Sequence, residues 1–172
     1  MVRGMRPIIG AFAALLVPAV VESAARAAGS IIFARGTWAA IDRGETCAAL
    51  GRSARVAAKG KVQAFAGFAF SADQRRWGEF HARLSRPSRS GSSVMLKVGK
   101  QPFLLVARGE WAWSRGPAQE QAIVAAVRTA AAMRVEARDA AGRRFTDPYA
   151  LEGAPTAIDA AAARCAGKMQ RR

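Results

Sequence analysis

The sequence predicts an α+β domain, mainly antiparallel β, built as a small curled sheet or sandwich with two helices in its second half and one disulfide. About seven short segments have the alternating or continuous apolar pattern of strands. Two alanine-rich segments with helical spacing begin near Pro117 and Pro155, both late in the chain. Antiparallel strands with segregated helices are typical of this class.

In the first half, the pattern predicts strands on either side of a segment that carries Cys47. Residues 36–42 read GTWAAID, which places Trp38 and Ala40 on one face. Residues 61–71 read KVQAFAGFAFS and alternate strongly, with Phe68 and Phe70 on the same face. Both segments are therefore expected to be half-buried strands.

Three further strands follow, two of them joined as a hairpin. In GEFHARLS (78–85), Phe80, Ala82 and Leu84 are expected to point inward. The Pro, Ser and Gly content of residues 86–93 predicts a mobile loop. VMLKV and FLLVA are separated by GKQP, a pattern typical of a β-hairpin.

The last third is predicted to contain a helix, a hairpin and a second helix. Pro117 is suited to a first helical turn, and the apolar stripe after it comprises Ile123, Val124, Val127 and Ala131. Residues 134–151 form a hairpin that turns at 140–142. The final helix begins at Pro155 and ends at Gly167, with an apolar stripe of Ile158, Ala161, Ala162 and Cys165.

Residues 1–27 are predicted to be a signal peptide that is removed on export. Arg3 and Arg6 precede an apolar stretch at 7–21, and Ala25-Arg26-Ala27 has the small-residue pattern of a cleavage site. The alternative is an uncleaved membrane anchor, although the stretch is shorter than the roughly 20 residues that a spanning helix needs. The expected location is therefore periplasmic or secreted.

The remaining chain is predicted to be a single β-rich domain. Residues 28–35 are expected to be a polar lead-in and 36–166 the domain itself. Residues 167–172 are expected to be a basic tail, too polar to pack. Cleavage after Ala27 would leave one domain's length of chain.

The charge balance favours anionic partners. The whole chain carries +15, and residues 1–27 hold three arginines and one glutamate, so +13 remains after cleavage. Such a charge attracts nucleic acid, acidic lipid headgroups and other polyanions without specificity. Export argues against a specific nucleic acid and allows peripheral membrane contact. The alternative is that the arginines only keep an alanine-rich protein soluble.

The two cysteines, Cys47 and Cys165, are predicted to form the disulfide. An even pair in an oxidising compartment is most simply a bridge. Cys165 lies on the apolar stripe of the last helix, which favours a structural clasp over a reactive thiol. Two distant cysteines and one histidine match no zinc spacing, so neither a metal nor a cofactor is expected.

The order of motifs resembles the invasion-associated locus B family, small exported proteins of alphaproteobacteria. The matching residues are Trp38, Cys47, Phe103 to Val106, Ala112-Trp113, Ile123 to Arg128, Gly142, Thr146-Asp147, Tyr149, Leu151, Gly153, Ala157 and Cys165. The resemblance covers roughly residues 36 to 166. Two departures are AAGRR where the family has a Ser-Arg-Gly hairpin, and Tyr149-Ala150-Leu151 where it has Tyr-Ser-Leu. The resemblance implies a periplasmic or secreted β-rich domain, associated in some members with host-cell entry, and it implies no catalytic residue.

Seven arginines are candidates for binding an anion. Arg83, Arg86 and Arg89 recur at intervals of three among serines, and guanidinium forks and serine hydroxyls can grip phosphates. The second hairpin adds Arg134, Arg138, Arg143 and Arg144. The sequence leaves open whether the two groups meet, and a disordered, solvated loop is the alternative for the first.

Trp111 and Trp113 are a candidate aromatic platform. They lie two residues apart and share one side of an extended segment, where they could stack on a sugar or a base beside Arg108 and Arg115. The alternative is core packing, because large aromatic side chains are usually mostly buried.

No catalytic residue is assigned. Glu79 and His81 share a strand face and could form an acid–base pair with a serine from 88–93, but no nucleophile motif accompanies them. An exposed histidine is the simpler interpretation. Asp147, before Pro148, is expected at a turn or sheet edge, capping local amides or pairing with Arg143 or Arg144.

The function predicted from these features is that of an exported, non-enzymatic domain of the invasion-associated locus B type that binds anionic envelope or host-surface components. One alternative is a structural or accessory envelope protein whose charge only solubilises it. A periplasmic hydrolase that uses Glu79, His81 and a loop serine is the other. The oligomeric state is left open.

Overall fold

The computed structural model describes residues 29–169 and contains ten strands and two helices in that range. The predicted signal peptide at 1–27 lies outside the described residues. The elements are β1 (Ser30–Arg35), β2 (Trp38–Arg43), β3 (Thr46–Arg52), β4 (Phe65–Ser71), β5 (Trp77–Arg83), β6 (Val94–Val98), β7 (Gln101–Arg108), β8 (Trp111–Trp113), α2 (Pro117–Thr129), β9 (Ala132–Arg138), β10 (Arg144–Ala150) and α3 (Ala154–Met169).

The strands form one unclosed antiparallel sheet, in the order β1-β2-β3-β4-β5-β8-β7-β6-β9-β10. The predicted class, α+β and mainly antiparallel β, is therefore confirmed, as a curled sheet and not a sandwich. β6, β7 and β8 lie beside β5 in reverse order, so that β8 pairs with β5, β7 pairs with β8 and β6 pairs with β7. The other edge of β6 is therefore open to β9, which pairs with it, and β10 pairs with β9 at the end of the sheet.

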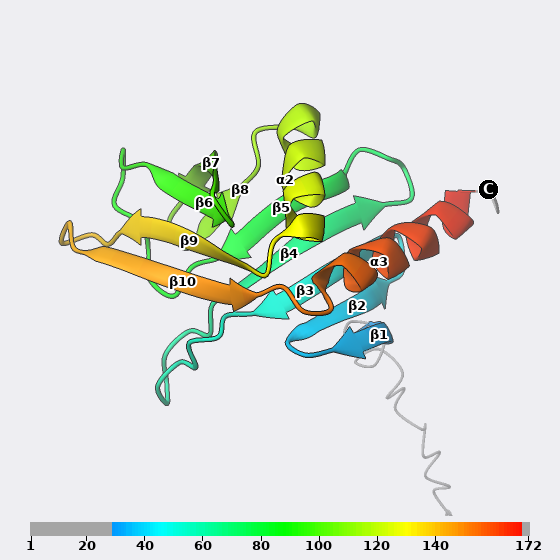
Figure 1. The fold of residues 1–172 in the computed structure, drawn as a ribbon, viewed down its shortest axis with the longest axis horizontal. Helices are drawn as coiled ribbons and strands as arrows, with labels where there is room; N and C mark the ends of the chain where they lie inside the picture. Colours follow the sequence, from blue (N-terminus) through cyan, green and yellow to red (C-terminus); the bar gives the residue numbers. More distant parts are fainter. Residues whose placement is uncertain (1–28, 170–172) are drawn as a thin grey trace, which may run out of the picture.

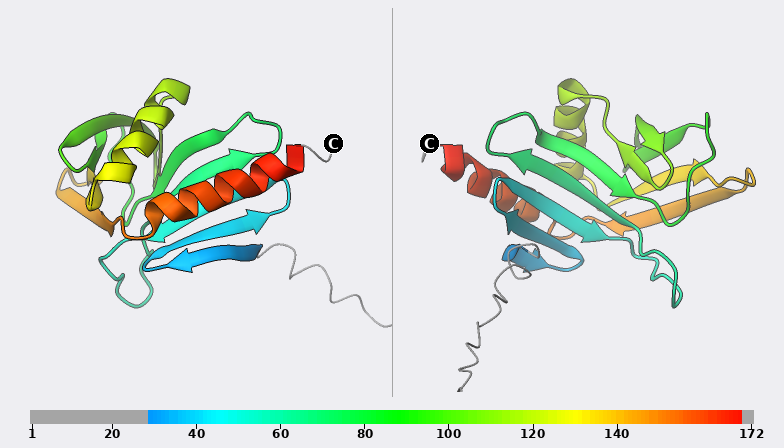
Figure 2. Two further views of the ribbon diagram at one scale, coloured as in Figure 1. Left: turned by 45° about the vertical axis from the view of Figure 1, so that its right-hand side comes forward. Right: turned by 180° about the vertical axis from the view of Figure 1, so that it is seen from behind.

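Both helices pack on the same face of the sheet (Figures 1 and 2). α3 lies across β1 to β4, and α2 packs against β5 and the neighbouring ends of β6 and β7. Seen from behind, the strands lie in front of the helices (Figure 2, right). Within residues 29–169 no helix packs on the opposite face of the sheet, here named the helix-free face.

The core lies between the sheet and the helices, and the predicted strand alternation is confirmed there. Phe80, Ala82 and Leu84 are fully buried, as are Trp38 and Phe68 from neighbouring strands. The main apolar side chains that the helices bring are Ile123, Val127, Ala157, Ile158 and Ala161. No helix of residues 29–169 has both the length and the apolar character needed to cross a membrane.

The structure adds three strands to those predicted. Residues 30–35, predicted as a polar lead-in, form β1, because Gly36 with φ of 60° and Thr37 make a two-residue hairpin turn onto β2. β8 is a three-residue strand between β5 and β7. β3 is rich in small residues that carry little strand signal, yet it pairs with strands on both sides.

The disulfide prediction is confirmed: Cys47 on β3 and Cys165 on α3 are bonded, with Cα atoms 5.8 Å apart. Both residues are fully buried. Asp42, directly opposite Cys47 in the β2–β3 pair, forms ion pairs with Arg164 and Lys168 of the same helix. The last helix is therefore clasped to the sheet by one covalent and two ionic links.

The predicted end of that helix was wrong. α3 does not stop at Gly167 but continues to Met169, because Lys168 turns back onto the sheet and donates to the Gly44 carbonyl as well as to Asp42. The first part of the predicted basic tail is thus packed. Its last three residues lie outside the described range.

Asp147 was predicted at an edge, and β10 is indeed an edge strand of the sheet. Its predicted role was wrong, because the side chain is 1% exposed and accepts a hydrogen bond from the Ser85 amide at 2.9 Å instead of pairing with Arg143 or Arg144. The neighbouring Tyr149 is also buried, and burial together with the Asp147 charge raises the pKa of its hydroxyl. This stretch is structural.

Candidate functional site

The arginine-bearing loop and the second hairpin lie against each other. The Arg89 amide donates to the Arg138 carbonyl at 2.8 Å, and Ser88 forms an isolated bridge with Asp139. Loop 86–93 is thus attached to the hairpin at two neighbouring points. The two predicted groups of arginines meet, which the sequence left open.

Asp139 holds this junction together. Its carboxylate accepts from the amides of Ala141 and Arg143, pairs with the Arg143 guanidinium at 3.1 Å and meets Arg86 at 3.4 Å. The Arg86 guanidinium also lies 6.0 Å from the centre of the Phe145 ring. One acidic residue thereby orients cations from both the loop and the hairpin.

Cations on neighbouring strands also face each other across the sheet. Arg138 on β9 lies directly opposite Arg144 on β10, and Arg134 on β9 lies directly opposite Lys97 on β6. Like charges that are directly opposed destabilise a strand pair. A bound anion would relieve this repulsion between Arg138 and Arg144, whereas Lys97 and Arg134 both pair with Glu136.

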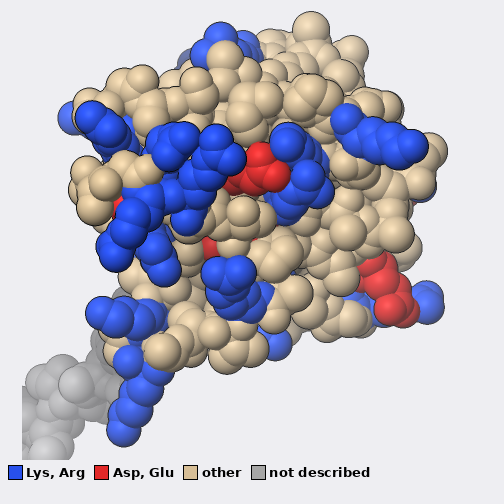
Figure 3. Space-filling view, turned by 60° about the vertical axis from the view of Figure 1, so that its left-hand side comes forward, with Lys and Arg blue, Asp and Glu red and all other residues tan. Residues whose placement is uncertain are grey.

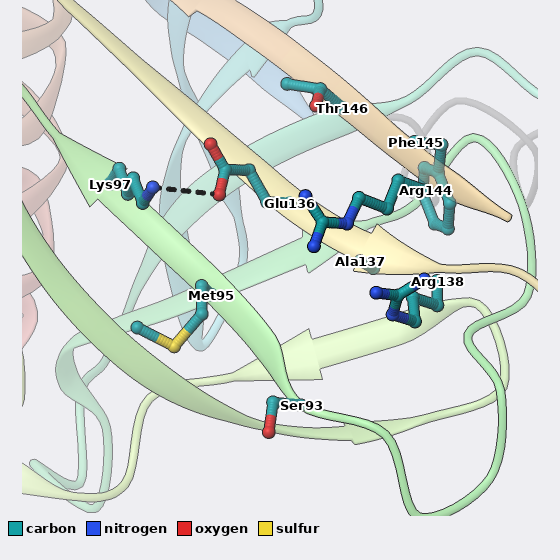
Figure 4. Close-up of a pocket in the computed structure, with 9 residues that line it drawn as sticks. All are labelled: Ser93, Met95, Lys97, Glu136, Ala137, Arg138, Arg144, Phe145 and Thr146. Carbon is teal, nitrogen blue, oxygen red and sulfur yellow. Dashed lines mark ion pairs between the residues drawn. The ribbon is translucent and has the colours of Figure 1, made fainter. Parts of the chain in front are cut away.

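Glu136 is the one acidic residue among the outward-facing side chains of β6, β9 and β10. It accepts a hydrogen bond from Arg134 at 2.6 Å. It also pairs with Lys97 at 3.0 Å (Figure 4). The hydrogen bond from Arg134 holds the pKa of Glu136 below its usual range, helped by Lys97 and opposed by burial. Arg138 donates to the Gly142 carbonyl, and among residues 29–169 neither Arg138 nor Arg144 pairs with a carboxylate.

These groups define the basic face, seven cations around two carboxylates. Its cations are Arg86, Arg89, Lys97, Arg134, Arg138, Arg143 and Arg144. A hollow of about 520 Å³ opens in it, lined by Arg138, Arg144, Lys97 and the hydroxyl residues Ser93 and Thr146 (Figure 4). Figure 3 shows Lys and Arg gathered on this side of the molecule, with few acidic atoms between them.

Arg83 does not belong to the basic face. It pairs with Glu110 at 3.2 Å and stands opposite Trp111 in the β5–β8 pair. Lys97, by contrast, was missed by the sequence analysis. The alternation of β6 was the available signal, because it turns Met95 and Lys97 outward between the buried Val94, Leu96 and Val98.

The tryptophan pair lies on the helix-free face of the sheet and is not core. Trp111 and Trp113 are half-buried on either side of the fully buried Ala112, with nearly parallel rings whose centres are 6.3 Å apart. Phe65 and His81 join them from β4 and β5. The two tryptophans therefore form a surface cluster with Phe65 and His81.

His81 was predicted to be exposed, and this was wrong. It is half-buried among aromatic rings because β8 docks beside β5. None of the serines at 88–93 lines the cavity around it, and Ser88 and Ser92 donate to main-chain carbonyls elsewhere. The geometry gives His81 and Glu79 no loop serine to activate.

No cluster of three or more metal-ligating side chains occurs in the described range 29–169. Comparison with protein-family models, with curated proteins and with solved structures found no match to this chain.

Proposed function

We propose that the chain is an exported, non-enzymatic domain of the invasion-associated locus B type that binds anionic components of the cell envelope or of a host surface through its basic face. The observation that carries this proposal is the opposition of Arg138 to Arg144, neither of which pairs with a carboxylate within residues 29–169. Beside them, Lys97 and Arg134 share the one carboxylate of Glu136. A merely solubilising charge gains nothing from cations that repel one another across a strand pair.

The surroundings of these cations suit oxyanions. Arginine forks bind phosphate, sulfate and carboxylate in two-point contacts, and Ser93 and Thr146 add hydroxyl donors at the same hollow. The attachment of loop 86–93 to the hairpin fixes part of the face before any ligand arrives. Such preorganisation reduces the entropy lost on binding.

The disulfide supports the exported location. Such bonds persist in the periplasm and outside the cell and are rare in the cytosol. Buried between β3 and α3, this one has a structural position and not the exposed position of a redox-active pair.

The test is co-sedimentation of the mature protein with phosphatidylglycerol vesicles along a salt gradient, with phosphatidylcholine vesicles as the uncharged reference. We expect binding to phosphatidylglycerol alone, weakening steeply between about 50 and 200 mM salt as counterions are released less readily. Immobilised heparin replaces the vesicles in a second arm, which distinguishes lipid phosphate from glycan sulfate as the preferred anion.

The double variant Arg138→Gln/Arg144→Gln should weaken binding by about tenfold or more, because one charge-assisted hydrogen bond contributes roughly 1.5 kcal/mol. The matched control, Lys59→Gln/Arg75→Gln, removes the same charge from exposed positions outside the basic face. Equal weakening by both variants, or binding that ignores salt, would contradict the proposal and leave an accessory role with a solvated charge.

A further inference from the structure

A second hollow lies on the helix-free face, centred on β4, β5 and β8 and separate from the basic face. A row of opposed residues crosses these strands: Leu50, Gly67, His81 and Trp113. Gly67 has no side chain, and Leu50 lies over it so closely that a Cβ there would be 2.5 Å from Leu50 Cδ2. A cavity of about 330 Å³, here named the outer groove, is lined by Leu50, His81 and Trp113 of this row and falls within the size range of small-molecule sites.

Aromatic rings form one wall of the outer groove. The Phe65 ring meets Trp111 edge-on, with centres 5.6 Å apart, and Trp111 and Trp113 lie nearly parallel, with 16° between their planes. Each ring is half-buried and keeps some surface toward solvent. Indole faces of this kind stack on flat or ring-shaped ligands.

Two exposed arginines, Arg43 and Arg76, complete the lining. Glu79 is the one carboxylate of the lining, and burial raises its pKa. Burial also lowers the pKa of His81, and the two arginines act in the same direction, so the ring is neutral at neutral pH. Two cations against one carboxylate disfavour a cationic ligand and favour an anion.

We propose that the outer groove binds a small molecule consisting of a six-membered ring that bears a carboxylate. The ring stacks on Trp111 and Trp113, and the carboxylate accepts hydrogen bonds from Arg43 and Arg76. The Glu79 carboxyl supplies a hydrogen-bonding group for a hydroxyl on such a ring. This inference does not rest on the basic face, because the two sites share no residue.

Sugar acids and aromatic acids both have this chemistry, so galacturonate and benzoate are the probes, with galactose and acetate as the matched ligands that lack the charge or the ring. Each is added to the mature protein at about 10 mM, enough to occupy a site with a millimolar Kd. The readout is the indole N–H resonance of each tryptophan, assigned with single Trp→Phe variants. Trp77, which is exposed and lies outside the groove lining, is the internal reference.

We expect galacturonate, benzoate or both to move the Trp111 and Trp113 resonances and leave Trp77 in place. The probe that acts identifies the source of the ring. Arg76→Gln should weaken that response at least fivefold, whereas Arg75→Gln, the adjacent exposed arginine outside the groove lining, should not change it. The Arg138→Gln/Arg144→Gln variant should respond as the parent does, so failure of one site is distinguishable from failure of the other.

Three results would overturn the proposal: no response to either ring acid, an equal response to galactose or acetate, or an equal loss in Arg75→Gln and Arg76→Gln. Both arginines are exposed, so their replacement leaves the core packing intact. The thermal unfolding midpoint of each variant checks this directly.

Discussion

Asp42 is a carboxylate at the point where α3 crosses β2, with a side chain that is 9% exposed. Burial works against its charge, but hydrogen bonds from Lys168 and Arg164 and from the Gly44 amide outweigh it and hold the pKa below the ordinary 3.8. A carboxyl whose pKa is lowered by folding adds stability above its unfolded pKa and loses it as pH falls through the folded value. Asp42 therefore makes the clasp of α3 sensitive to acid.

We expect Asp42→Asn to lower the free energy of unfolding by about 1–3 kcal/mol at neutral pH, since hydrogen bonds to a charged group contribute in this range. The gap between variant and parent should narrow as pH falls below the ordinary pKa of 3.8, because Asp42 then becomes protonated in the folded state as well. Urea unfolding of both proteins from about pH 7 to about pH 2 checks this. A gap that is constant with pH would show that the ion pairs are not its cause.

At position 51 only glycine fits, because the Trp38 side chain leaves no room for a Cβ atom. A Cβ on it would lie 2.4 Å from Cε2 of Trp38, whose buried indole donates to the Ala150 carbonyl at 2.8 Å and so joins β2 to the end of β10. The indole is held on both sides and has no room to move aside.

Gly51→Ala should therefore destabilise the fold by roughly 1–3 kcal/mol, the usual cost of an overpacked core. Gly167→Ala is the matched control, because that glycine lies within α3 and nothing comes within 4 Å of its added Cβ. It should stabilise by about 0.5–1 kcal/mol through helix propensity. Thermal unfolding measures the change in stability of each variant, which should be a loss for Gly51→Ala and a gain for Gly167→Ala. Two losses or two gains would contradict this account.

At the scale of elements, α3 depends on its covalent link to β3. The bond between Cys47 and Cys165 spans 118 residues of sequence. Closing a loop of this length stabilises a fold by about 4–5 kcal/mol in the chain-entropy model, and often by less.

Cys47→Ala/Cys165→Ala should lower the free energy of unfolding by up to about 4 kcal/mol. α3 should lose amide protection in hydrogen exchange before β4 and β5, because α3 lies outside the sheet and those strands are paired on both sides. Reductant added to the parent should reproduce the effect and should do nothing to the variant. Uniform loss of protection across α3 and the strands would show that the helix and sheet open as one unit.

The same elements show how far the sequence can be interpreted. Phe80, Ala82 and Leu84 were predicted inward because one-sided burial imposes a period of two. β3 was missed because its residues are small for a tertiary reason: α3 packs on them and Trp38 lies over Gly51. The local sequence pattern around β3 cannot show this, because the small side chains are required by α3, a helix more than a hundred residues later in the chain.

The sequence predicted most of the residues of the candidate sites, but it did not predict which residues lie beside them on the surface. The arginines and the tryptophan pair stand out in the sequence, yet their neighbours depend on the pairing of β6 with β9 and of β8 with β5. The same pairing half-buries His81, which sequence alone placed in solvent. Non-sequential strand order is a long-range property that periodicity does not report.

At the scale of the whole molecule, the charge is +15, or +13 after the predicted cleavage, and it acts at a distance. A field of this size steers anionic surfaces toward the protein from every side, so the association rate depends on total charge and on salt. Dissociation depends on contacts made in the complex. The two rate constants therefore report the field and the basic face separately.

We expect Arg138→Gln/Arg144→Gln and Lys59→Gln/Arg75→Gln to slow association with captured phosphatidylglycerol vesicles by the same factor, because each removes two charges from the same total. Only the first should speed dissociation, by about tenfold, because only it removes cations that are opposed across a strand pair. Surface plasmon resonance at two salt concentrations measures both rates. Dissociation rates that rise equally in the two variants would mean that the anion is held by diffuse charge and that the opposed pairs have no special part in binding.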